Sequence, residues 1–260
     1  LLDRQFELPE LKMMVDSIAS SKFLSEAKTK TLIQKLETLC SSYQARALNR
    51  EVTLANRVKS MNNTIHINVD QLHVAIAENT QVKFRYFDYD LNKQRRYFKK
   101  GECYVVSPWR MLYADDNYYL LAWDAKEEKF KHFRVDKMDG VAQVLLGNIR
   151  VAREGAEAFD KLDMSAYTQY TFSMFGGEVE HVTMIFQNRM MGAVMDRFGR
   201  DVVVLKEDER HFRITVPVAV SQQFFGWVFS LGKTVRIAAP EAVREKMKAS
   251  LEEISKRYSE

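Results

Sequence analysis

Residues 104–137 read YVVSPWRMLYADDNYYLLAWDAKEEKFKHFRVDK, and this stretch decides the fold. Three runs rich in aromatic and β-branched residues, at 104–113, 118–123 and 130–135, are separated by two polar turns. Strand propensity combined with Asp and Asn turn chemistry predicts a three-stranded antiparallel meander. Pro108 lacks a backbone donor, so the first strand is expected to bend, bulge or lie at a sheet edge there.

The third run carries the most chemistry, because side chains alternate between the two faces of a strand. Phe133 and Val135 are expected to point into the core. His132 and Arg134 would then point together to the other face, where they could receive an anion or form an ordinary solvated surface. Between Gln81 and Lys137 the sequence holds 13 Lys/Arg and 9 Asp/Glu, an excess of +4, which favours an anionic partner.

The composition defines the class of protein. The length of 260 residues suggests two domains or one large one, and 46% hydrophobic with 28% charged residues is ordinary for a soluble globular protein. No apolar run approaches the roughly 20 residues that span a bilayer, and the first residues lack the order of a signal peptide. Cys40 and Cys103 are too few for a disulfide framework. These features predict a cytoplasmic protein with no membrane contact.

The residues before the meander predict helices followed by a strand. Pro9 suits the first position of one helix, and Ser25 can cap a second. The second helix should carry an apolar stripe formed by Leu32, Leu36, Leu39 and Tyr43. Residues 44–68 are expected to form a connector, Asp70 to cap a short helix ending near Glu78, and 82–86 to form a strand.

The residues from about 170 onward predict the order strand, helix, strand, strand, helix, strand. This βαββαβ order is typical of a ferredoxin-like split sandwich. A last helix follows Pro240, and one of its faces carries the apolar stripe Val243, Met247, Leu251 and Ile254. The two unpaired stripes predict a homodimer.

The sequence offers no recognisable catalytic or metal-binding motif. It has no phosphate-binding glycine loop, no GxSxG and no HExxH. None of the five histidines lies beside another His or a Cys at ligand spacing. We therefore expect no enzymatic activity, no metal and no cofactor.

The pattern S-P-W, then Y-Y-L-L-A-W-D, then H-F-R-V-D-K-M resembles the WYL domain of bacterial transcriptional regulators. The name-giving triplet is Tyr118-Tyr119-Leu120, with tyrosine in the tryptophan position, and residues 133–136 match the family's F-R-x-D motif. Residues 6–11 reproduce the string F-E-L-P-E-L, which in this family lies downstream of an N-terminal winged helix. The resemblance covers nearly the whole chain and implies that the DNA-binding head is absent from this sequence.

The resemblance implies an α+β protein in four parts. Residues 1–68 would be a helical linker and dimerisation segment, and 69–145 a WYL domain folded as a small SH3- or Sm-like β-barrel of roughly five strands. Residues 146–166 would be a linker, and 167–260 the C-terminal extension domain with the ferredoxin-like fold.

The implied function is the effector-sensing and oligomerising part of a transcriptional regulator. The barrel would bind an anionic effector, single-stranded nucleic acid or a nucleotide, and change how the missing head holds duplex DNA. The alternative is a scaffold for dimerisation or protein contact without a ligand. Binding predicts that Arg134, His132 and Tyr119 share one concavity, and a scaffold predicts that such groups are already paired with Asp136 and Asp124.

The motif match predicts the ligand-binding residues. Arg134 would clamp a phosphate, His132 would add a pH-dependent donor and Tyr119 would stack on a base or donate its hydroxyl. Trp109 either packs in the barrel or lines the pocket. The remaining candidates are Ser107 and Arg110 beside these residues, and a weaker cationic surround of Lys83, Arg85 and Arg96.

Overall fold

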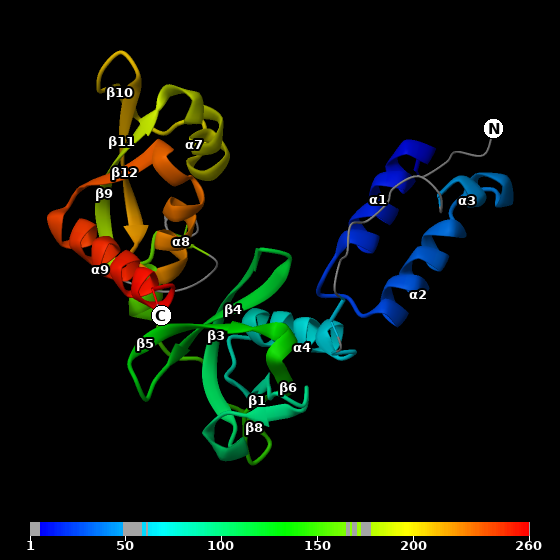
Figure 1. Ribbon diagram of the computed structural model, residues 1–260. Coiled ribbons are helices and arrows are strands. Elements are labelled where there is room, and N and C mark those ends of the chain that lie inside the picture. The colour runs from blue at the N-terminus through cyan, green and yellow to red at the C-terminus, as the bar shows by residue number, and fades with distance from the viewer. Residues whose placement is uncertain are drawn as a thin grey trace. The chain divides into compact units, whose positions relative to one another are not determined.

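The computed structural model describes residues 6–48, 59–60, 62–164, 167, 171–172 and 178–259 (Figure 1). The chain divides into two compact units, Leu1–Ala156 and Glu157–Glu260. Each unit has its own hydrophobic core, as separately folding domains do. The first unit therefore extends past the point where the linker 146–166 was predicted to begin, and residues 165–166 of that linker lie outside the described residues.

Three helices open the first unit: α1 (Leu8–Ser20), α2 (Glu26–Glu37) and α3 (Ser42–Leu48). The predicted cap of the second helix is confirmed, and the first helix begins one residue before Pro9, its predicted first position. Pro9 lies in the first turn of α1, where its missing N–H has no helical partner to lose. The Ser25 hydroxyl accepts a hydrogen bond from the backbone N–H of Lys28 and so caps α2.

The second helix is shorter than its predicted apolar stripe, which comprised Leu32, Leu36, Leu39 and Tyr43. Helix α2 ends at Glu37, and the following turn changes the direction in which later side chains point. Leu36 packs against the buried cluster that Leu11 and Val15 of α1 form. Leu39 is 47% exposed and Tyr43 is 85% exposed, so the prediction of one continuous stripe is wrong.

Helix α4 (Ile65–Ala77) begins before the predicted cap Asp70. Asn62 forms the turn that starts the helix, because its side-chain oxygen accepts a hydrogen bond from the backbone two residues later. Asn68, assigned from the sequence to a connector, is buried and donates from Nδ2 to the Met138 carbonyl at 3.0 Å. Residues 49–58 and 61 of the predicted connector lie outside the described residues.

Six strands form one antiparallel sheet: β1 (Val82–Tyr89), β2 (Arg95–Tyr97), β3 (Tyr104–Ala114), β4 (Asn117–Asp124), β5 (Lys129–Arg134) and β6 (Met138–Gln143). Their order is β2-β1-β3-β4-β5, and β6 pairs with β1. After β5 the chain makes a single 3₁₀ turn, η2 (Val135–Lys137), and returns to β1, so the sheet curls (Figure 1). The sequence did not predict β6, because Asp139 and Gly140 interrupt its apolar pattern.

The predicted meander is confirmed as β3, β4 and β5. Asp115 and Asp116 join β3 to β4 with φ angles of 49° and 60°, the left-handed pair that a type I′ hairpin turn requires. The predicted irregularity at the proline is also confirmed. The register between β3 and β4 shifts between Pro108 and Arg110, so Trp109 is the extra residue of a β-bulge.

The core of the first unit lies between α4 and one face of the sheet. Its buried side chains alternate along the strands as predicted, and they include Val82, Phe84, Val106, Leu120, Ala122 and Phe133. Three short elements follow the sheet: β7 (Leu145–Leu146), β8 (Ile149–Arg150) and α5 (Ala156–Asp160). An isolated bridge between Thr80 and Ala152 holds this segment to the start of β1.

The second unit has the predicted order of strands and helices: β9 (Val179–Gln187), α7 (Met191–Phe198), β10 (Val204–Lys206), β11 (His211–Ala219), α8 (Gln222–Ser230), β12 (Val235–Ala239) and α9 (Glu241–Arg257). Its four strands form an antiparallel sheet in the order β10-β11-β9-β12. The core contains fully buried Phe186, Phe224 and Met184. The predicted α+β class is confirmed.

No described helix combines the length and apolar character that crossing a membrane requires. The described part of the chain also contains no group of three His, Cys, Asp or Glu side chains placed to hold a metal ion. Cys40 and Cys103 are both free thiols.

Candidate anion-binding site

Four of the predicted site residues share one face of the meander. Arg110 of β3 lies opposite Leu121 of β4, which lies opposite His132 of β5. In the next row Tyr119 lies opposite Arg134. Residues directly opposite project from the same side of a sheet, so the predicted alternation is confirmed. The face itself is less open than a solvated strand surface, because Leu121 is 0% and Tyr119 is 7% exposed.

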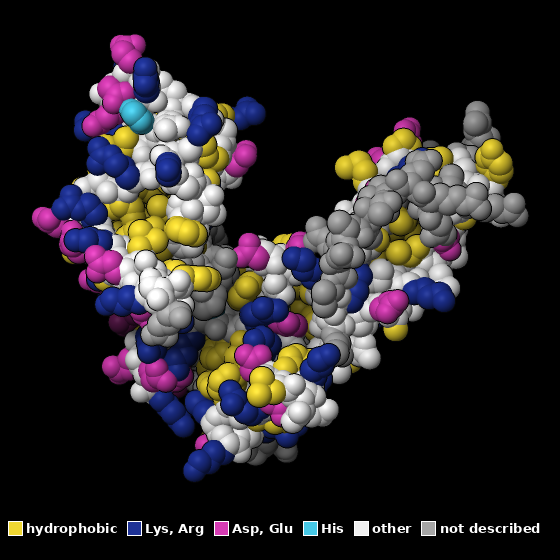
Figure 2. Space-filling view, in the orientation of Figure 1, with side chains coloured by type: hydrophobic (Ala, Val, Ile, Leu, Met, Phe, Trp, Pro, Cys, Tyr) yellow, Lys and Arg dark blue, Asp and Glu magenta, His cyan; other side chains and the backbone are white. Residues whose placement is uncertain are grey.

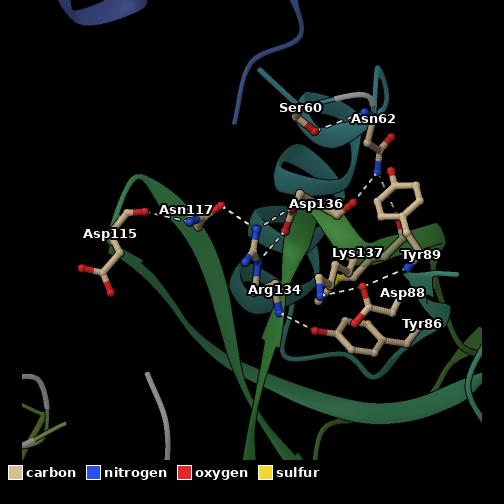
Figure 3. Close-up of polar contacts among 11 residues, drawn as sticks. Ser60, Asn62, Tyr86, Asp88, Tyr89, Asp115, Asn117, Arg134, Asp136 and Lys137 are labelled. Carbon is tan, nitrogen blue, oxygen red and sulfur yellow. Dashed lines mark hydrogen bonds and ion pairs between the residues drawn. The ribbon is translucent and has the colours of Figure 1, made fainter. Parts of the chain in front are cut away.

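Arg134 is already held by groups of its own fold (Figure 3). Its Nε donates to Asp136 Oδ1 at 3.1 Å, and its Nη2 donates to Asp136 Oδ2 at 2.8 Å. The same Nη2 donates to Asn117 Oδ1 at 3.0 Å. Burial opposes the charge, but the hydrogen bonds and charge of Asp136 outweigh it and raise the pKa of Arg134. Arg134 is therefore a paired residue, as the scaffold alternative predicted.

The turn after Arg134 is connected to the residues before α4. The Asp136 carbonyl accepts a hydrogen bond from Asn62 Nδ2 at 2.8 Å (Figure 3). The backbone N–H of Arg134 donates to the hydroxyl of Tyr86 at 3.1 Å. Burial raises the pKa of Tyr86 to about 12, so the hydroxyl stays protonated. Lys137 also pairs with Asp88 of β1 at 3.1 Å. These contacts fix η2 between β1 and the N-terminal part of the unit.

Burial changes the pKa at which His132 can become charged. Its imidazole is partly buried, and burial lowers the pKa of His132 to about 4. The ring is therefore neutral at neutral pH, and the predicted pH-dependent donor would gain its charge only near pH 4. Burial likewise raises the pKa of Tyr119 and leaves little of its ring surface accessible for a base to stack on.

Ser107 and Trp109 both form hydrogen bonds with the backbone of Glu154. Ser107 Oγ accepts a hydrogen bond from the Glu154 N–H at 2.9 Å, and Trp109 Nε1 donates to the Glu154 carbonyl at 2.8 Å. Both side chains are buried, at 1% and 7% exposure. The packing alternative for Trp109 is thus supported, and both residues hold the segment 152–155 against the meander rather than facing solvent.

Segment 152–155 also contains Arg153, a cation that was not predicted from the sequence as a site residue. The Arg153 guanidinium lies over the Trp109 ring, with Cζ 3.7 Å from the ring centroid. Its Nη1 makes two long hydrogen bonds, each 3.5 Å, to the carbonyls of Ile76 and Pro108. Burial and then the positive charge of Arg110 lower the pKa of Arg153. Among the described residues, no carboxylate forms an ion pair with Arg153.

The three cations predicted as a surround lie elsewhere on the sheet, at Lys83, Arg85 and Arg96. Strand β1, which carries the first two, is separated from β5 by β3 and β4. Arg85 pairs with Asp139 of β6 and lies over the Tyr97 ring at 4.6 Å. These residues are therefore not gathered with Arg110 and His132.

Comparison with known families identifies both units. The WYL domain family matches residues 68–143, and the WCX domain family matches residues 178–255. The chain therefore belongs to the proteins that carry a WYL domain followed by a WCX domain, as its motifs predicted. No curated protein matches the sequence.

Two solved structures are similar to the chain at low identity. One is proteasome accessory factor B/C (PafBC) of Arthrobacter aurescens, at 18% identity and a TM-score of 0.32, covering 94% of this chain and 35% of that chain. The other is a CRISPR Cas-related protein, at 12% identity and a TM-score of 0.44, covering 99% of this chain and 75% of that chain. This chain thus spans about a third of the length of PafBC.

Proposed function

We propose that this chain is the effector-sensing and oligomerising part of a bacterial transcriptional regulator. Its WYL unit binds an anionic ligand, namely single-stranded nucleic acid or a nucleotide. The two family matches support the regulatory role. In this proposal the protein works in the cytoplasm as a homodimer, catalyses no reaction, and contacts duplex DNA only through a head outside this sequence.

One observation carries the choice of ligand. Arg153 is stacked on the Trp109 ring and lies where the like charge of Arg110 destabilises its protonated form. An anion beside both guanidinium groups would replace this repulsion with two charge-assisted interactions. Arginine presents a planar fork that matches a phosphate oxygen pair, so a phosphate is the anion that this pair fits best.

Arg134 therefore has a different role from the phosphate clamp that the sequence predicted. Its guanidinium already has two carboxylate oxygens and one amide oxygen as acceptors. A ligand phosphate would have to displace Asp136, whereas at Arg153 it would displace only two long bonds to carbonyls. The anchor of the proposed site is therefore Arg153 with Arg110, and Arg134 supports the fold beside it.

The contacts of the first unit offer a route from the site to the N-terminal helices. Phe23, between α1 and α2, packs edge-on against Tyr118 at the start of β4, with ring centroids 4.9 Å apart. Lys22 pairs with Asp116 in the same hairpin turn at 3.5 Å. Together with the bond from Asn62 to the turn η2, these contacts would let a change in the meander alter the helices next to the head.

A binding titration tests this function. Fluorescence anisotropy of a labelled short oligothymidylate would be measured with the parent chain, Arg153→Ala and Arg153→Lys. Loss of one charge-assisted interaction of about 1.5–3 kcal/mol predicts roughly 10- to 150-fold weaker binding for Arg153→Ala. Arg200→Ala removes the same charge from an exposed position in the second unit and is expected to bind like the parent. Equal affinity of folded Arg153→Ala and parent would reject the site.

The scaffold without a ligand remains the second candidate, because one specific observation favours it. Arg134 pairs with Asp136, and Lys131 pairs with Asp124 at 2.7 Å, so two prominent cations of the third meander strand are neutralised within the fold. A scaffold predicts no binding of short oligonucleotides or nucleotides by the parent chain. Binding that weakens with Arg153→Ala would exclude it.

We assign the curled sheet of the WYL unit to the SH3- or Sm-like barrels and the second unit to the ferredoxin-like sandwiches. After β5 the chain turns back, and β6 pairs with β1, which supports the first assignment. The order β10-β11-β9-β12 with antiparallel neighbours supports the second.

A further inference from the structure

The second unit contains an apolar groove with a volume of about 530 Å³ between α8, β12 and α9. This volume lies within the range of roughly 300–1,000 Å³ that is typical of sites for small molecules. Figure 2 shows apolar surface on this unit bordered by Lys and Arg side chains. The apolar residues that line the groove are Val228, Phe229, Val235, Ile237, Met247 and Leu251.

Helix α9 forms one wall of the groove with a single stripe of side chains. Its lining residues recur at intervals of three and four, the spacing that places helical side chains on one face, and they are Arg244, Met247, Lys248 and Leu251. The first turn of the helix is anchored by Val243, which is 1% exposed and belongs to the core of the unit. Strand β12 lies at one end of the order β10-β11-β9-β12, so the groove opens where the sheet ends.

Large apolar side chains at the groove are only partly covered by the chain itself. Phe229 is 63% exposed and Leu251 is 37% exposed. Between these two and the core lies Met247, which packs against the core cluster. An aliphatic chain lying in the groove would remove this surface from water, which is favourable because apolar burial is the main driving force of such binding.

The charged side chains that line the groove are all cations, and they come from separate elements. Lys233 lies in the turn between α8 and β12, Arg236 in β12 and Lys248 in α9. The fourth cation, Arg244, donates to Glu241 at 2.7 Å and is therefore neutralised. Within the described residues, the other three cations form no ion pair. An occupant with an aliphatic tail and an anionic head would match both the apolar surface and the charge of the groove.

We propose that this groove binds the anion of a long-chain fatty acid. The aliphatic tail covers Phe229 and Leu251, and the carboxylate lies against Arg236, whose planar fork matches two carboxylate oxygens. Lys233 and Lys248 add positive potential around the carboxylate. The second unit then senses a fatty acid at a site separate from Arg153, so this inference does not rest on oligonucleotide binding by the WYL unit.

Isothermal titration calorimetry of the whole chain with sodium dodecanoate, kept below its micelle concentration, tests the class of ligand. Decanoate has two methylene groups fewer and should bind roughly tenfold more weakly, because each buried methylene contributes to the free energy of binding. Dodecyltrimethylammonium has the same tail with a positive head, and it should bind at least about tenfold more weakly than dodecanoate. No binding of dodecanoate, or equal binding of the two head groups, would overturn the proposal. A dodecanoate affinity that falls as the chain concentration rises would overturn it in favour of a second copy in the groove.

Variants at the groove then test its location. Arg236→Ala should weaken dodecanoate binding at least about tenfold through the lost charge-assisted interaction, and Phe229→Ala should weaken it roughly five- to tenfold through lost apolar contact. Both side chains are exposed, so circular dichroism should show an unchanged fold. Lys256→Ala and Tyr258→Ala remove the same kinds of side chain from α9 beyond the groove and should bind like the parent. Equal affinity of folded Arg236→Ala and the parent, or a loss of dodecanoate binding in Arg153→Ala instead, would overturn the assignment of the fatty acid to this groove.

Discussion

Arg134 and Asp136 hold each other through two hydrogen bonds, Nε to Oδ1 at 3.1 Å and Nη2 to Oδ2 at 2.8 Å. The two residues flank Val135, so the pair closes over the point where β5 becomes the turn η2. The guanidinium that sequence motifs assign to a ligand is thus neutralised by its own chain. Arg134 therefore stabilises the fold, whereas Arg153 is the residue that we propose binds an anion.

The first prediction follows from this pair. Arg134→Ala leaves Asp136 and Asn117 without a donor, and it should lower the free energy of unfolding by about 1–2 kcal/mol, since part of the pair is screened by solvent. Arg134→Lys should recover less than half of the loss, because an ammonium cannot form both bonds of the fork. Urea denaturation measures each value. Equal stability of Arg134→Ala and the parent would show that the pair contributes nothing.

The second prediction concerns the pH dependence of stability. Burial lowers the pKa of His132 from its ordinary value of 6.5 to about 4. Below pH 6.5 the unfolded chain binds a proton at His132 that the folded chain does not, so stability falls as the pH falls from 6.5 towards 4. At 1.36 kcal/mol per pKa unit, the loss from this residue reaches about 3 kcal/mol near pH 4.

The control for this effect is His132→Gln, whose side chain does not titrate. The difference in unfolding free energy between the parent and His132→Gln should change between pH 7 and pH 4 in the direction of a less stable parent at low pH. A difference that is constant over this interval would mean that His132 is not buried in its neutral form.

The third prediction compares two glycines with left-handed backbone. Gly155 has φ +87°, and a Cβ there would lie 2.5 Å from Cγ of Trp123; Gly147 has φ +63° with nothing within 4 Å of the added atom. Gly147→Ala should lower the unfolding free energy by about 1–2 kcal/mol through its backbone alone. Gly155→Ala should lower it by roughly a further 1–3 kcal/mol, because the added methyl overlaps the indole. Similar losses in the two variants would argue against the close approach of this segment to Trp123.

The fourth prediction tests the route to the N-terminal helices. Asn62→Ala removes the hydrogen bond to the Asp136 carbonyl. Oligothymidylate binding should alter hydrogen exchange in α1 and α2 of the parent, and this change should be lost in Asn62→Ala while the affinity stays within about threefold. A response that persists in the folded variant would show that the signal does not pass through Asn62.

Much of the fold could be predicted from sequence, because local patterns determined it. Asp115-Asp116 between aromatic runs predicted the β3–β4 hairpin, and Pro108 predicted the bulge in β3. The start of α4 could not be predicted. Asn68 is polar by type but buried, and only its distant acceptor, the Met138 carbonyl, makes that burial favourable.

The candidate site was predicted less well, because its contacts also join residues that are far apart in the sequence. Strand alternation correctly placed His132 and Arg134 on one face, but it carries no information about how deeply that face is buried. Arg153 could not be found, because its contact with Trp109 joins residues far apart in the sequence and no local spacing indicates it. The F-R-x-D motif did contain a local signal for the pairing of Arg134, because its last residue is the partner Asp136.

The central claim is that the WYL unit binds an anionic, phosphate-bearing ligand at Arg153. The most direct test is the anisotropy titration of a labelled short oligothymidylate over a series of salt concentrations, with the parent, Arg153→Ala, Arg134→Ala and Arg200→Ala. If about three phosphates are engaged, the parent's log affinity should fall with log salt at a slope of about −2, and Arg153→Ala should reduce that slope by about 0.7. Arg134→Ala and Arg200→Ala should keep the parent's slope. Binding that is absent in the parent, insensitive to salt, or unchanged in folded Arg153→Ala would contradict the account.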